Sequence, residues 1–152
     1  MMKEATRKNV HDLYALMRDA HLNGLKKTED KVAVLRVMRE LRYIAVKYDD
    51  DNKEASEKLM PKGYMERLRK AQKYEAERRG GKQPTEMSES EYREFIVEMQ
   101  DYKLAVDAAM LDVDNAKVEL EYEPVDCDVL MQLMTDNGWT VDQYLRVEEM
   151  MK

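Results

Sequence analysis

The chain has 152 residues, enough for one domain of ordinary size, and 43% of them are hydrophobic and 38% charged. This balance suits helices with one apolar face, whereas five glycines and three prolines are too few for an all-β fold. The sequence shows no apolar run near the roughly 20 residues that span a bilayer, no apolar signal core and only one cysteine. We therefore expect a cytoplasmic protein with no membrane partner.

The first predicted element is a helix from Glu4 to Asn23, which Gly24 ends. A long helix is predicted from Thr28 to Leu59, because an apolar seam runs along it in heptad spacing. This seam consists of Val34, Met38, Leu41, Ala45, Tyr48, Ala55 and Leu59. The polar run Asp49–Asn52 either lies within one continuous helix or breaks it in two.

The first long helix carries more apolar residues than one seam needs. Leu35, Val37 and Ile44 widen the apolar stripe, and a wide stripe needs a second partner. We expect the N-terminal helix to cover part of it. The same three residues are candidates for contacts in a homo-oligomer such as a dimer, or with another protein.

A shorter helix is predicted from Tyr64 to Arg79, within the most basic stretch of the chain, Lys62–Lys82. Basic residues with interleaved tyrosines can hold single-stranded nucleic acid, but alternating glutamates are typical of an exposed helix with internal ion pairs. The candidates for contact with an anionic partner are Arg67, Arg69, Lys70, Lys73, Arg78 and Arg79. The stretch from Gly80 to Met87 is predicted to be a mobile loop.

Ser88 and Glu91 form a predicted capping box at the start of a second long helix, Glu89–Lys117. Its unbroken heptad seam consists of Tyr92, Phe95, Met99, Tyr102, Val106, Ala109, Val113 and Ala116. Because the two long helices have similar lengths, we expect them to form an antiparallel, coiled-coil-like hairpin in which the seams pair. Val118–Tyr122 then alternates like a strand and is either a strand or an extended arm.

The C-terminal residues are predicted to form a short helical hairpin. Asp126 or Asp128 caps a first helix, Asn137-Gly138 ends it, and Thr140 with Gln143 forms the capping box of a second. The expected fold is therefore all-α. A helical hairpin domain would span residues 1–125, and residues 126–152 would pack on it or act as an interaction tail.

The charge is distributed unevenly along the chain. Residues 1–87 hold 21 Lys and Arg against 15 Asp and Glu, whereas residues 88–152 hold 5 against 17. The excess charges either complement each other within the hairpin or leave one acidic face for a basic partner.

Candidate catalytic and metal-binding residues all have simpler interpretations. His11 and His21 point in different directions on one predicted helix, and the carboxylates beside Cys127 disfavour its thiolate. Asp49–Asn52 lacks the central glycine of a calcium-binding loop. We therefore expect no catalytic residue, no metal and no cofactor.

The order of elements resembles that of small phage- and prophage-encoded helical-hairpin proteins of unknown function. The segments that carry the resemblance are Ala33–Leu41, Lys58–Pro61 and Val118–Pro124. The resemblance implies an accessory or assembly role and supplies no site residues. We expect a non-enzymatic protein that acts through protein–protein contacts; the alternative is a nucleic-acid-binding accessory protein that uses Lys62–Lys82.

Overall fold

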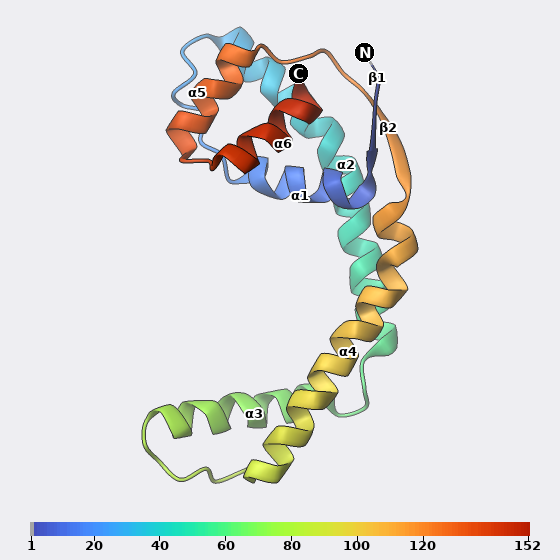
Figure 1. Ribbon diagram of the computed structural model, residues 1–152, viewed down its shortest axis with the longest axis vertical. Helices are drawn as coiled ribbons and strands as arrows, with labels where there is room; N and C mark the ends of the chain where they lie inside the picture. Colours follow the sequence, from blue (N-terminus) through green and yellow to red (C-terminus); the bar gives the residue numbers. More distant parts are fainter. Residues whose placement is uncertain (1) are drawn as a thin grey trace. The chain divides into compact units, whose positions relative to one another are not determined.

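The computed structural model describes residues 2–152, which form six helices and one two-stranded sheet (Figure 1). In chain order the elements are β1 (Met2–Thr6), α1 (Arg7–Arg18), α2 (Thr28–Leu59), α3 (Tyr64–Arg79), α4 (Glu89–Asn115), β2 (Lys117–Glu121), α5 (Cys127–Asn137) and α6 (Val141–Met151). The predicted class, helical with hairpins and a short strand, is confirmed. The chain divides into two compact units, the first made of residues 1–51 and 112–152 and the second of residues 52–111.

The N-terminal segment differs from its prediction because it supplies the partner strand for β2. The two strands pair antiparallel, from Met2 opposite Glu121 to Thr6 opposite Lys117. The helix predicted to begin at Glu4 therefore begins at Arg7, where the Thr6 side chain accepts a hydrogen bond from the backbone N–H of Asn9. A lone strand is marginal in water, so this pairing is what allows β2 to form.

Helix α1 also ends earlier than predicted, at Arg18 rather than Asn23. Downstream, the backbone of His21 bonds to a side chain of α5 instead of continuing the helix: its N–H donates to Oδ1 of Asn137. Leu25 then turns into the core and is almost fully buried. Tertiary contacts therefore fix the segment between α1 and α2 in a non-helical path.

The first unit has one core, to which its helices and β2 all contribute. Its apolar side chains come from α1, the first part of α2, β2, α5 and α6. The most deeply buried are Val10, Met17, Val34, Val37, Leu41, Leu130, Leu133, Val147 and Met151. Residues 126–152, predicted either to pack on the hairpin domain or to act as an interaction tail, contribute Leu130, Leu133, Val147 and Met151 to this core.

The second unit has a smaller, aromatic core between α3 and α4. Tyr64, Tyr74 and Phe95 are buried there, and the Tyr74 ring stacks on Tyr92 with centroids 4.3 Å apart. The early half of the α4 seam thus packs on α3, whereas we expected it to pack on the seam of α2. The buried part of the α2 seam lies in the first unit's core instead.

Helices α2 and α4 still contact each other within both units. In the first unit, the Tyr48 hydroxyl donates to a carboxylate oxygen of Asp114. In the second, the Tyr102 hydroxyl donates to the backbone carbonyl of Ser56. In each bond the tyrosine belongs to a predicted seam, whereas its partner lies beside the predicted seam of the other helix.

Helix α2 is continuous over 32 residues and passes through the acidic run without a break. Cations of α1 and α2 that lie beside the run reduce its self-repulsion. Asp51 pairs with Arg7 at 3.6 Å and with Lys47 at 2.9 Å, and Asp49 contacts Nε2 of His11 at 2.8 Å. The sequence alone left open whether this run breaks the helix. With these partners the acidic side chains fit within one continuous helix.

Candidate interaction surfaces

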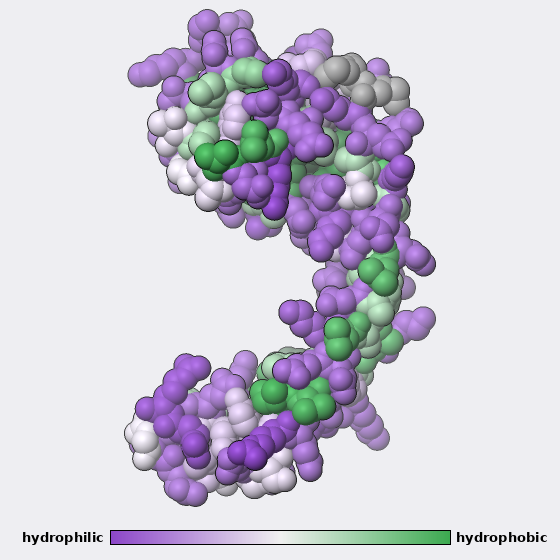
Figure 2. Space-filling model, viewed as in Figure 1, coloured by the Kyte–Doolittle hydropathy of each residue, from purple (hydrophilic) through white to green (hydrophobic). Residues whose placement is uncertain are grey.

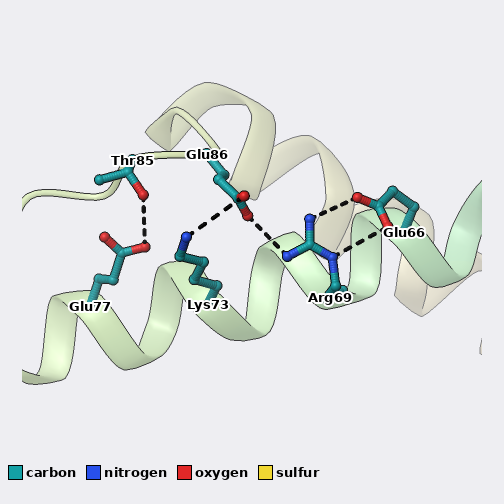
Figure 3. A network of polar contacts seen from close by, with 6 residues as sticks. All are labelled: Glu66, Arg69, Lys73, Glu77, Thr85 and Glu86. Carbon is teal, nitrogen blue, oxygen red and sulfur yellow. Dashed lines mark hydrogen bonds and ion pairs between the residues drawn. The ribbon is translucent and has the colours of Figure 1, made fainter.

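Cations of the basic stretch on α3 form ion pairs with carboxylates of the same unit, as Figure 3 shows. Arg69 donates to Glu66 at 2.7 Å and to Glu86 at 3.1 Å, and Lys73 lies 3.6 Å from Glu86. Hydrogen bonds from Arg69 lower the pKa of both glutamates. These cations therefore already have the anionic partners that a nucleic acid would have to supply.

The other candidates on α3 have internal partners as well. Arg67 bonds to Glu98, Arg79 pairs with Glu75 at 3.8 Å, and Arg78 lies over the Tyr74 ring. Lys70 lies near enough to Glu66 to lower the pKa of that carboxyl. The tyrosines of the stretch, Tyr64 and Tyr74, are buried in the aromatic core and cannot stack on bases from outside. This arrangement favours the exposed-helix interpretation of the stretch.

The loop after α3, predicted to be mobile, is anchored at its far end. Met87 is buried in the aromatic core, and Glu86 bonds to α3 through Arg69. The Thr85 hydroxyl donates to Glu77 at 3.3 Å (Figure 3). The loop therefore supplies one of the carboxylates that pair with the cations of α3.

The three candidates for oligomer contacts lie in different environments. Leu35 is 51% exposed on α2, whereas Val37 is fully buried and Ile44 packs against the core of the first unit. Val37 follows Val34 by three residues and precedes Leu41 by four, so it lies on the buried seam itself. Of the three, Leu35 alone is open to a partner.

A second stripe of side chains follows α2 on its exposed side. At 100° per residue, Val32, Leu35, Arg39, Tyr43 and Val46 fall within an arc of about 80°, and two further arginines flank the arc. We name this set the arginine face: Val32, Leu35, Arg36, Arg39, Arg42, Tyr43 and Val46. The Tyr43 side chain is 83% exposed. A shallow concavity with an accessible volume of about 620 Å³ surrounds it.

The arginines of this face differ from all others in the chain. The sequence contains eleven arginines. Eight have a carboxylate or aromatic partner: Arg7, Arg18, Arg67, Arg69, Arg78, Arg79, Arg93 and Arg146. Within residues 2–152, no hydrogen bond or ion pair joins the side chain of Arg36, Arg39 or Arg42 to another residue. Three unpaired guanidinium groups thus share one face with an exposed tyrosine, and two of them, those of Arg39 and Arg42, line the concavity around it.

Helix α4 has an exposed stripe of the opposite charge, and Figure 2 shows apolar surface along this helix between hydrophilic patches. Val97, Leu104 and Leu111 are each more than half exposed and recur every seven residues. Among the residues that the structure describes, the neighbouring carboxylates of Glu94, Asp101 and Asp107 have no ion-pair partner. We name this set the acidic face: Glu94, Val97, Asp101, Leu104, Asp107, Ala108 and Leu111.

The histidines bond to neighbouring groups of the first unit. The His11 ring lies between Asp12, at 3.3 Å, and Asp49, and its centroid is 4.5 Å from that of Tyr48. The backbone of His21 bonds to Asn137. In the described part of the chain, no three His, Cys, Asp or Glu side chains are grouped so that they could hold a metal ion.

A groove of about 540 Å³ lies between β1, α1 and α6 in the first unit. Its two cations already have internal partners. The Lys3 ammonium donates to the backbone carbonyl of Glu149 at 3.0 Å, and Arg146 pairs with Asp142 at 2.9 Å. This groove therefore offers a ligand fewer unpaired charges than the arginine face does.

Comparison of the chain with protein-family models, with curated proteins and with solved structures gives no match. Over residues 2–152, no helix combines the length and the apolar character needed to cross a membrane.

Sequence reasoning missed most of the arginine face, although part of its signal was visible. The spacing of Val32, Leu35, Arg39, Tyr43 and Val46 follows a helical period on the side opposite the seam. The missing information was which arginines have partners. The ion pairs Arg7–Asp51 and Arg67–Glu98 join residues far apart in the sequence, and a local pattern does not reveal them.

Proposed function

We propose that the protein is a non-enzymatic accessory or assembly protein that acts by binding another protein chain through the arginine face. The observation that carries this proposal is the trio Arg36, Arg39 and Arg42, unpaired within residues 2–152 and on the same helix face as the exposed Tyr43. Arginine and tyrosine are enriched at protein interfaces and among the residues that dominate binding energy. An accessory role is also what the resemblance in layout to phage-encoded proteins implies.

Two features favour a protein partner over a nucleic acid. The arginines alternate with Val32, Leu35 and Val46, which would gain free energy on burial against apolar side chains but not against phosphates. The concavity around Tyr43 is also lined by Glu40 and Asp50, so its charges are mixed, whereas a phosphate backbone is negative along its whole length and offers no apolar group to Tyr43 and Val46.

The shape of the face favours a macromolecule over a small substrate. The concavity is formed by side chains of a single helix and is open to solvent. Small-molecule sites are usually enclosed clefts that bury most of their ligand. A helical partner that lies along α2 would instead contact the whole stripe, as in other helix-in-groove and helix-pair interfaces.

A photo-reactive amino acid in place of Tyr43 tests this proposal in the cells that encode the protein. The matched control carries the same group in place of Thr135, an exposed position on α5 outside the arginine face. We expect light to produce a covalent adduct with a protein from position 43 and none from position 135. Equal yields at both positions, or no protein adduct at position 43, would refute the proposal.

A further inference from the structure

Building on the proposed function, we infer that the arginine face of one chain binds the acidic face of a second copy of this chain. The contact would join α2 of one copy to α4 of the other. The two faces are complementary in charge, in spacing and in length, and each of these properties is measured on one helix by itself.

The charges of the two faces match in number and in availability. The arginine face presents Arg36, Arg39 and Arg42, and the acidic face presents Glu94, Asp101 and Asp107. Among residues 2–152, none of the six is joined to another side chain by an ion pair or a hydrogen bond. The guanidinium groups of one face and the carboxylates of the other therefore both lack a partner, and pairing the two faces would supply each with an opposite charge.

The spacing on both helices is that of a packed helix pair. Val97, Asp101, Leu104, Ala108 and Leu111 follow steps of four and three, and they fall within an arc of about 80°. The apolar positions of the arginine face fall within an arc of the same width. On each helix, charged residues flank both edges of the arc, where coiled coils place the ion pairs that select partners.

The two faces also have the same length. Val32 and Val46 are separated by fourteen residues, as are Val97 and Leu111, so each stripe is roughly 21 Å long at 1.5 Å per residue. With the two stripes in register, Asp101 on α4 is level with Arg36 of α2 in a parallel pair and with Arg42 in an antiparallel pair. Either arrangement brings a carboxylate of one stripe beside an arginine of the other, whereas an apolar partner would leave both charges unsatisfied.

Charge reversal of one face at a time tests the inference with the full-length chain. The first variant carries Arg36→Glu, Arg39→Glu and Arg42→Glu, and the second carries Glu94→Lys, Asp101→Lys and Asp107→Lys. We expect each variant alone to self-associate at least about tenfold more weakly than the wild type, because like charges then meet. An equimolar mixture of the two should associate as the wild type does. A chain with both faces reversed should also regain self-association.

Sedimentation velocity measures these associations, and circular dichroism checks that each variant keeps its helices. The smaller pair Arg39→Glu and Asp101→Lys replaces the triple variants if either of them unfolds. A mixture that stays as monomeric as its components would overturn the inference, and so would a monomeric wild type that binds an oligonucleotide through Arg39 and Arg42. If Tyr43 cross-links to a different protein, the proposed function stands and the self-pairing inference fails.

Discussion

The side chain of Asn137 holds the backbone of His21 from both sides. Its Oδ1 accepts from the His21 N–H at 2.6 Å, and its Nδ2 donates to the His21 carbonyl at 3.1 Å. These two bonds fasten the last turn of α5 to the segment that follows α1. They join residues more than a hundred positions apart and help to make the C-terminal helices part of the first unit.

We expect Asn137→Ala to lower the free energy of unfolding by about 1–3 kcal/mol, since two backbone groups lose their partner. Urea denaturation followed by circular dichroism measures this change. Gln132→Ala on the same helix is the control, because Gln132 is exposed and, within residues 2–152, its side chain bonds only to that of Asp136. Equal effects of the two substitutions would show that the His21 contact adds nothing.

Leu130 tests whether α5 belongs to the core of the first unit. Its side chain is fully buried, so Leu130→Ala should cost about 2–5 kcal/mol through lost burial and the cavity left behind. The next residue, Met131, is 55% exposed, and Met131→Ala should change stability by less than about 0.5 kcal/mol. If the tail were a separate appendage, Leu130→Ala would leave the unfolding of α1 and α2 unchanged.

Tyr122 makes the first unit sensitive to alkaline pH. Burial raises the pKa of its hydroxyl to about 12, and the hydroxyl donates to the backbone carbonyl of Met150. Because the folded pKa lies above the ordinary value of 10.0, this contribution to stability is complete below pH 10 and is lost as the pH rises through 12. Unfolding free energies should fall over this range more steeply in the wild type than in Tyr122→Phe. Parallel slopes would show that Tyr122 does not titrate in this way.

Arg69 controls the titration of the carboxylates on α3 and its loop. Hydrogen bonds from Arg69 lower the pKa of Glu66 and Glu86 below 4.5. The ion pairs therefore stabilise the fold above the ordinary pKa and are lost as the pH falls through the lower folded values. In Arg69→Ala, nuclear magnetic resonance should show both carboxyl titrations shifted upward towards 4.5. Arg146→Ala, in the other unit, should leave them unchanged, and an unchanged Glu86 in Arg69→Ala would contradict the network.

The starts of α4 and α6 and the end of α5 could be predicted because their signals are local. The capping boxes at Ser88 and Thr140 each involve a residue three positions away, and both form in the structure. Gly138 ends α5 with a φ of 62°, a backbone angle that glycine adopts without strain. Each of these signals lies within a few residues of the helix end that it marks, so the sequence was sufficient.

The partners of each element could not be predicted in the same way. Strand β1 forms because β2, more than a hundred residues later, offers a partner, and nothing in the first six residues shows this. The α4 seam was recognised, but an apolar stripe fits any apolar neighbour, and α3 covers its early half through Phe95 and Tyr92. The arginine face escaped notice for a similar reason, since the ion pairs of the other arginines depend on the fold.

Sedimentation equilibrium of the wild-type chain at low and high salt tests the pairing of the arginine and acidic faces most directly. The chain has a mass of 18.0 kDa. At low salt we expect an average mass that rises with protein concentration to at least twice this value. At about 1 M salt, where the Debye length is about 3 Å, it should fall back towards the monomer. A mass of 18.0 kDa at every concentration and salt would contradict the pairing of the two faces.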